Sequence, residues 1–240
     1  MSKNIIFKFA ELFCGPGGLG LGATMAKIIN SDSFYSFTPV WANDIDSDTC
    51  KTYARNIHPD EPSAVVCGPV EKIDFGKVPN FDILAFGFPC NDFSIVGKQK
   101  GFNGKFGPLY TYGIKAINTH NPKFFVAENV SGLQSANNGY AFKKILEDLG
   151  SAGKGYKITA HLYKFENYGV PQQRHRIVIV GIRKDLNLEF KVPAPTTQNK
   201  PVTVREAFEN PPISKNATNN EISMPSAIVI ERLKYIPAGE

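Results

Sequence analysis

The chain has 240 residues, of which 42% are hydrophobic and 20% are charged, a balance typical of soluble globular enzymes. No apolar run approaches the length of a membrane span, and Lys8 and Glu11 interrupt the apolar stretch at the N-terminus, so neither a membrane protein nor a signal peptide is indicated. The net charge of +5 suits a polyanionic partner, although many enzymes without one are equally basic. We expect a cytoplasmic protein.

Strand-like apolar runs alternate with helix-like segments through the first 183 residues. In chain order we expect a strand at residues 5–13, a helix at 19–29, a strand at 38–44, a helix at 47–56 capped by Asp46 or Ser47, strands at 64–67 and 81–87, a helix ending at 115–120, a strand at 124–128, a helix at 140–149, and strands at 158–165 and 177–182. This rhythm predicts a doubly wound, Rossmann-like α/β fold with a mostly parallel sheet. Ligands then bind at the carboxyl ends of the strands.

The amino-acid composition changes after Arg183, where prolines, asparagines and threonines become frequent. We interpret residues 184–201 as a connector, followed by short helices near 204–208 and 226–235. The domain prediction is therefore a catalytic, cofactor-binding domain at 1–183 and a separate segment at 184–240.

A glycine-rich turn follows the first expected strand and opens a helix. Gly15, Gly17 and Gly20 form a G-x-G-x-x-G pattern, which lets backbone approach a ligand closely, although a plain tight turn would also explain it. Asp44, at the end of the next strand, is placed to accept hydrogen bonds from a ribose diol, whereas Asp46 is better explained as a helix cap. These features indicate an adenosine-bearing cofactor without separating NAD from S-adenosylmethionine.

Cys90 follows the strand at 81–87 within the sequence Gly-Phe-Pro-Cys-Asn-Asp-Phe-Ser. A thiol at the carboxyl end of a strand is a candidate nucleophile, and the alternative is a small buried core residue. The polar neighbours Asn91, Asp92 and Ser94 argue against deep burial. The glycine-flanked basic loop at 96–102 is suited to close over a phosphodiester backbone, or is an ordinary solvated loop. The four cysteines contain no C-x-x-C pair, so no metal site is expected.

Two further motifs carry charged side chains to the same edge. Glu128 ends an apolar strand, and we expect it to be partly desolvated and to act as a proton donor; a turn formed by Asn129 is the structural alternative. In extended geometry Gln172, Arg174 and Arg176 share one face of a strand. Their guanidinium groups need acceptor partners, either within the fold or on a substrate.

Together these motifs resemble the DNA cytosine-5 methyltransferase family from Phe9 to about Arg183. The glycine turn is similar to the family's first motif, Pro89-Cys90 to its catalytic motif, Glu128-Asn129-Val130 to its sixth, and the segment Gln172–Arg176 to its Q-x-R-x-R motif, all in the family's order. The resemblance implies the methyltransferase version of the α/β fold, with S-adenosylmethionine as cofactor and duplex DNA carrying a flipped cytosine as partner.

The resemblance also implies roles for individual residues. Cys90 is the nucleophile, Glu128 acts on the base, Arg176 contacts the flipped base, and Arg174 and Gln172 shape the pocket. We expect the DNA side to include Ser94, Lys98, Gln99 and Gln172. The residues at cofactor-contact positions are Phe13, Gly15, Gly17, Gly18, Leu19, Asp44, Ile45, Val70, Pro89 and Leu109.

This sequence departs from the family pattern in three places. Asn91 replaces the usual glutamine after the catalytic cysteine, and Pro69 replaces an aspartate that contacts the adenine amino group. The target-recognition domain and the last motifs are not found. The chain is then either a fragment or one subunit of a split enzyme whose second chain supplies recognition, and we expect it to methylate poorly alone.

Two other functions remain open at this stage. A tRNA cytosine-5 methyltransferase shares most of these motifs, and the segment that would best separate the two is the one not found. A non-catalytic nucleic-acid-binding regulatory module would also use this fold. A dehydrogenase is disfavoured because it would leave Cys90, Glu128 and the arginines without a shared purpose.

Overall fold

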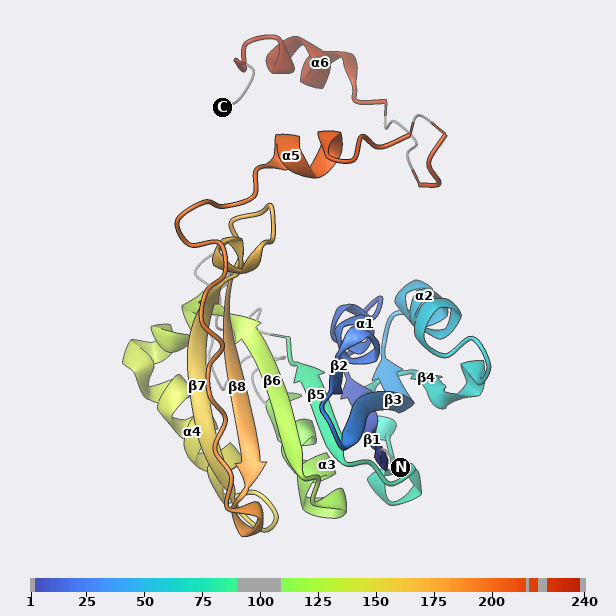
Figure 1. Ribbon diagram of the computed structural model, residues 1–240, viewed down its shortest axis with the longest axis vertical. Coiled ribbons are helices and arrows are strands. Elements are labelled where there is room, and N and C mark those ends of the chain that lie inside the picture. The colour runs from blue at the N-terminus through green and yellow to red at the C-terminus, as the bar shows by residue number, and fades with distance from the viewer. Residues whose placement is uncertain (1–2, 90–108, 215, 220–223, 238–240) are drawn as a thin grey trace.

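The computed structural model describes residues 3–89, 109–214, 216–219 and 224–237. Its eight strands form one mixed sheet in the order β2-β3-β1-β5-β6-β8-β7, with β4 pairing β3 (Figure 1). The strands are β1 (Lys3–Leu12), β2 (Lys27–Ile29), β3 (Ser33–Asp44), β4 (Val65–Cys67), β5 (Ile83–Gly87), β6 (Phe124–Val130), β7 (Tyr156–Lys164) and β8 (His175–Arg183).

The central pairs β3-β1, β1-β5 and β5-β6 are parallel, as is β3-β4, whereas β8 runs antiparallel to both β6 and β7. The expected α/β fold with a mostly parallel sheet is therefore confirmed. Because parallel strands end together, the carboxyl ends of β1, β3, β5 and β6 meet along one edge of the sheet. Among the described residues, Asp44 in β3 and Glu128 in β6 are brought to that edge.

Helices cover both faces of the sheet, as a doubly wound fold requires. Helices α1 (Gly18–Met25) and α2 (Ser47–Ile57) lie apart from α3 (Tyr110–His120) and α4 (Tyr140–Ser151) (Figure 1). Alternate residues of β5 serve the two faces: Leu84 and Phe86 pack in a cluster with α3 and α4, and Ile83 and Ala85 in a cluster with α1. This alternation is the period of two that a strand buried on both faces produces.

One expected helix boundary is wrong. The helix predicted at 19–29 ends at Met25, and residues Lys27–Ile29 form β2, which pairs antiparallel with β3. Ile28 and Ile29 are β-branched and face Tyr35 and Phe34 across that pairing. Residues of this type favour a strand once a partner is present, and the helical periodicity of residues 19–29 does not reveal the hairpin that pairs them with residues 34–36.

The segment after β8 packs differently from the rest. No described residue after Gly181 is buried, and helices α5 (Val204–Glu209) and α6 (Ala227–Leu233) bury none of their side chains. Both helices stand away from the sheet in Figure 1. The connector is nevertheless attached near the strand ends, because the backbone N–H groups of Thr196 and Thr197 both donate to the carbonyl of Asn167.

Candidate active site

The turn between β1 and α1 is held open by its backbone geometry. Phe13 has a φ of 54°, in the left-handed region that a non-glycine residue rarely occupies, and Gly15 has a φ of 51°. Two contacts hold this shape: Cys14 N–H donates to Asn43 O at 3.0 Å, and Gly15 N–H donates to Asp44 Oδ2 at 2.7 Å. At Gly15 and Gly18 an added Cβ would meet nothing within 4 Å, so backbone faces open space there.

The other two glycines of the turn are needed for packing. A Cβ on Gly17, whose φ is 104°, would stand 3.0 Å from the ring of Tyr53, and one on Gly20 would stand 2.6 Å from its hydroxyl. Both positions therefore admit α2 close to the turn. The G-x-G-x-x-G pattern thus combines one open position, Gly15, with two, Gly17 and Gly20, that allow a neighbouring helix to pack closely; Gly18, between them, is also open.

Asp44 and Asp46 have different partners at the end of β3. Asp46 caps α2, because its Oδ1 accepts from the backbone N–H groups of Asp48 at 3.0 Å and Thr49 at 2.8 Å. The preferred interpretation of Asp46 is confirmed, and those hydrogen bonds, that from Thr49 first, hold its pKa below the usual range. Asp44 instead orders the glycine turn through Gly15, in addition to accepting from Asp46 N–H.

A cleft of about 510 Å³ opens beside this turn at the carboxyl edge of the sheet. It is lined by Glu11, Phe13, Cys14, Gly18, Leu19, Gly87, Glu128, Phe165, Val170 and Arg174. Residues from the turn, from β5, from β6 and from the segment before β8 therefore share one cavity. Of the expected site residues, the cleft brings together Phe13, Gly18, Leu19, Glu128 and Arg174.

The other described residues expected to contact the cofactor are not among those that line this cleft. Val70 is buried in the main apolar cluster, and Phe13 and Leu109 pack against the same cluster. Ile45 is 71% exposed at the end of β3, and Pro89 is partly exposed directly after Phe88. Gln172 is exposed. Cys90, Ser94, Lys98 and Gln99 lie outside the described residues.

Glu128 and Arg176 form an ion pair, with Arg176 Nε 2.7 Å from Glu128 Oε1. Their side chains are 25% and 21% exposed, respectively, so both are partly removed from water. Glu128 is also the register partner of Gly87, and a Cβ added at Gly87 would stand 3.3 Å from its Oε2. The carboxylate is therefore partly desolvated, as expected, and its partner is a cation.

Arg174 presents its guanidinium differently from Arg176. Its side chain lines the cleft, and no ion pair of its guanidinium is found among the residues that the structure describes. Its backbone N–H donates weakly, at 3.4 Å, to Glu166, whose carboxylate also contacts His175 Nε2 at 2.8 Å. Of the two arginines, Arg176 therefore forms an ion pair with a carboxylate of the fold, whereas Arg174 is the one that lines the cavity.

Two features of this site were missed from the sequence. Asn129 is buried and its Nδ2 donates to Phe88 O at 3.0 Å, which ties the end of β6 to the chain two residues before Cys90. Glu11 is 2% exposed and its Oε2 accepts from the hydroxyl of Tyr53 at 2.9 Å. The position of Asn129 beside Glu128 was a signal for the first; the second joins residues 42 apart and has no local signature.

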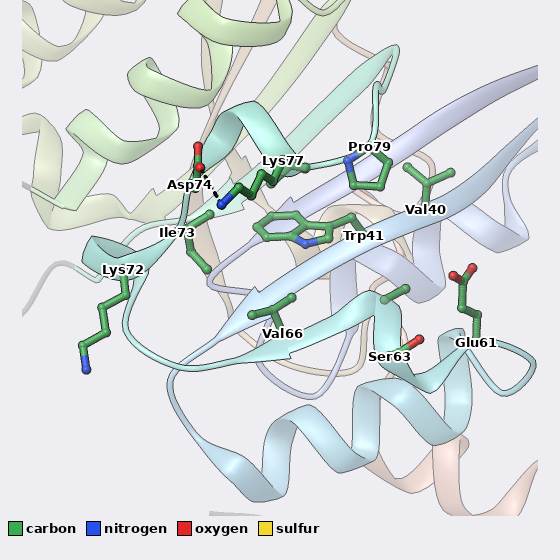
Figure 2. Close-up of a pocket in the computed structure, with 12 residues that line it drawn as sticks. Val40, Trp41, Glu61, Ser63, Val66, Lys72, Ile73, Asp74, Lys77 and Pro79 are labelled. Carbon is green, nitrogen blue, oxygen red and sulfur yellow. Dashed lines mark ion pairs between the residues drawn. The ribbon is translucent and has the colours of Figure 1, made fainter.

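A second cavity of about 400 Å³ lies elsewhere, against β3 and β4. Figure 2 shows Trp41 on its floor, with Val66 and Ile73 beside it and the ion pair of Lys77 and Asp74, at 3.4 Å, above. None of the residues expected to bind cofactor or DNA lines this cavity. The described residues that were expected at the site and that line a cavity are thus found at the cleft beside the glycine turn.

A family model for C-5 cytosine-specific DNA methylases matches residues 7–234. The chain belongs to this family. The chain is 52% identical over 240 residues to the Type II methyltransferase M.BbvI of Brevibacillus brevis, an alignment that covers 97% of this chain and 64% of that protein. It is 38% identical over 241 residues to the Type II methyltransferase M.NgoFVII of Neisseria gonorrhoeae, which covers 97% of this chain and 60% of that protein.

Solved structures agree on the fold. The chain superposes on the Entamoeba histolytica methyltransferase EhMeth with a TM-score of 0.66 at 20% identity, over 96% of this chain and 66% of that one. At that identity the likeness concerns the fold alone. The chain spans less than two thirds of the length of M.BbvI and of M.NgoFVII. No helix among its described residues is long and apolar enough to cross a membrane.

Proposed function

We propose that this methylase transfers a methyl group from S-adenosylmethionine to C5 of cytosine in DNA, through a covalent bond between Cys90 and C6. The observation that carries the proposal is the ion pair of Glu128 and Arg176. Its carboxylate lies beside Gly87 and, with residues of the glycine turn, Glu128 lines the cleft. Cys90 follows Gly87 by three residues in the sequence. A carboxyl group and a cofactor-type turn therefore line one cavity, and Cys90, which lies outside the described residues, is the nucleophile that the proposal adds to them.

The cleft suits the proposed cofactor. Open backbone at Gly15 and Gly18, the carboxylate of Asp44, and the apolar side chains of Phe13 and Leu109 offer contacts for a ribose, a base and an amino-acid tail. The further cofactor residues of the proposal are Gly17, Leu19, Ile45, Val70 and Pro89. When bound, S-adenosylmethionine supplies an electrophilic methyl group.

Different residues of the chain then act on different atoms of the cytosine. The Cys90 thiolate adds to C6, and Glu128 hydrogen-bonds or protonates N3, which stabilises the electron-rich ring. Arg176 fixes the carboxyl group of Glu128 and contacts the flipped base, while Arg174 and Gln172 shape the pocket. After C5 is methylated, loss of the C5 proton and elimination of Cys90 restore the aromatic ring.

The segment 184–240 is, in this proposal, a connector and the beginning of a recognition region. Its apolar side chains support a covering partner: Phe208, Ile228 and Leu233 are each more than half exposed. Burying such side chains contributes about 1.5–3 kcal/mol each. We propose that further polypeptide, either in the same chain or in a second subunit, covers them and selects the target base on duplex DNA.

Transfer of a labelled methyl group tests the activity. The full chain is mixed with the part of M.BbvI that it does not cover, and labelled S-adenosylmethionine is offered with duplex DNA or with tRNA. We expect label on DNA, more than without the added part. Label on tRNA alone would contradict the assignment of the substrate, and equally robust, sequence-specific transfer by the unsupplemented chain would contradict the need for a covering partner.

Duplex DNA carrying 5-fluorocytosine tests the covalent step. A fluorine at C5 cannot leave as a proton does, so the enzyme is trapped on the base and the adduct survives denaturing electrophoresis. Cys90→Ala should abolish the adduct. Cys67→Ala is the matched control, because Cys67 is an exposed cysteine of β4 outside the proposed site. Adduct formation by Cys90→Ala, or its failure in all proteins under conditions of methyl transfer, would contradict the mechanism.

A further inference from the structure

Glu11 is an acidic side chain in the wall of the cleft that the proposed mechanism does not use. It stands next to last in β1, lines the 510 Å³ cavity, and is only 2% exposed. Its carboxyl group accepts from Tyr53 of α2 at 2.9 Å and from the backbone N–H of Gly20 in α1. Both donors are neutral, so they orient the carboxyl group without neutralising it.

The groups around Glu11 supply no positive charge. Tyr53 faces it from α2, Cys14 from the turn, and Asp44 from β3, and the last of these is an anion. Glu128 and Arg174 line the same cleft, and neither is among the groups that shift the pKa of Glu11. Among the described residues no ion pair includes Glu11. A carboxylate buried without a cation is costly, and burial accordingly raises the pKa of Glu11 to about 8.

S-adenosylmethionine brings into the cleft what Glu11 lacks, because its sulfonium and its α-ammonium group are both positively charged. We propose that Glu11 is a cofactor-binding residue that accepts this charge, and that it gives up its proton when S-adenosylmethionine binds. The inference rests on the proposed function, since it takes the cofactor from there. Tyr53 and Gly20 are positioning groups, since they hold the carboxyl group in place in both protonation states.

Because proton release is linked to binding, the affinity for S-adenosylmethionine must depend on pH in a definite direction. In the free protein Glu11 keeps its proton up to about pH 8, and in the complex the adjacent positive charge lowers the pKa of Glu11. The complex then holds fewer protons than its free components, so affinity for the cofactor rises with pH and levels off above about pH 8. For one proton the dissociation constant falls by at most about tenfold per pH unit.

Isothermal titration calorimetry of the full chain with S-adenosylmethionine measures the proton directly. Titrations at pH 7 in two buffers with different ionisation enthalpies give the number of protons released. We expect a release approaching one proton, and a dissociation constant about tenfold lower at pH 8 than at pH 6.5. Glu11→Gln keeps the shape and an acceptor oxygen but cannot ionise, so its proton release should be close to zero.

Comparison with Glu11→Gln also removes the titration of the cofactor's own ammonium group, which both proteins share. Tyr53→Phe, which loses a donor but keeps the carboxyl group, should still release the proton. Equal proton release by wild type and Glu11→Gln, or binding by the wild type without release, would overturn the inference alone. Failure of S-adenosylmethionine to bind either protein would overturn the proposed function with it.

Discussion

Arg176 on strand β8 reaches diagonally across the sheet to Glu128 on strand β6, with Nε 2.7 Å from Oε1. The residue opposite Arg176 in the antiparallel register is Val130, two positions beyond Glu128. A diagonal cross-strand pair of this kind is fixed by register, so a slip of β8 by one residue would turn Arg176 to the other face, away from Glu128. The charge arrangement at the cleft therefore depends on how β8 is aligned against β6.

We expect Arg176→Ala to lower single-turnover methyl transfer by about 100-fold, because Glu128 then loses the group that orients it toward the base. The rate for Arg176→Lys should lie between those of the wild type and Arg176→Ala, because lysine keeps the positive charge but lacks the planar guanidinium group. Lys143→Ala serves as the control, because its ion pair with Glu147 on α4 is largely exposed and 4.0 Å long. Wild-type rates for Arg176→Ala would contradict the role of the pair.

Asn129→Asp should lower the free energy of unfolding by about 1–3 kcal/mol, because the buried Nδ2 donor to Phe88 O is replaced by a second acceptor. Urea denaturation followed by circular dichroism measures the loss. The matched change Asn56→Asp removes a similar donor to Thr52 O at 2.9 Å on an exposed face of α2, and should cost much less. Equal losses in both variants would show that burial at Asn129 does not matter.

Gly20→Ala and Gly22→Ala form a pair of substitutions within one helix. At position 20 the added Cβ would stand 2.6 Å from the Tyr53 hydroxyl and 3.0 Å from Glu11 Oε2, so the variant should lose about 1–3 kcal/mol of stability and bind cofactor more weakly. At position 22 nothing lies within 4 Å, and the better helix former should stabilise by about 0.5–1 kcal/mol. Thermal unfolding distinguishes the two; the same sign for both would contradict this packing.

Glu11 should make the stability of the free protein depend on pH. Its pKa is raised by burial from 4.5 to about 8, so the folded state holds a proton that the unfolded chain releases in this window. Stability is then fully present below pH 4.5 and decreases as pH rises to about 8, by up to about 1.4 kcal/mol per unit. Urea denaturation at pH 5, 6.5 and 8 should show wild type losing stability relative to Glu11→Gln. Parallel curves for the two proteins would contradict the raised pKa.

Most strands and helices could be predicted from the sequence because their patterns are local. The apolar runs before Gly15 and before Glu128 predict strands, and Asp46, as an N-cap residue, predicts the start of α2. The strand Lys27–Ile29 could not be predicted, because it exists only through its pairing with β3. The pattern of a segment describes what that segment favours by itself, whereas a pairing depends on the conformation of a second segment.

In the candidate site, too, the positions of residues along their strands could be predicted, whereas their contacts could not. Strand-end positions such as Asp44 and Glu128 follow from the order of strands, so sequence reasoning found them. The partner of each side chain was not predictable: Glu128 with Arg176, Asn129 with Phe88, and Glu11 with Tyr53 all join residues 41 or more positions apart. Those pairings determine charge and orientation, which periodicity does not encode.

No described residue beyond Gly181 contributes a buried side chain, which has a consequence for how this chain can change over generations. Substitutions in α5, α6 and the segment between them leave the packing energy of the sheet untouched. The free energy that holds the cleft together and the surface that would meet a partner are thus encoded in separate stretches of the gene. One sheet can therefore be joined to many different partners without being refolded for each.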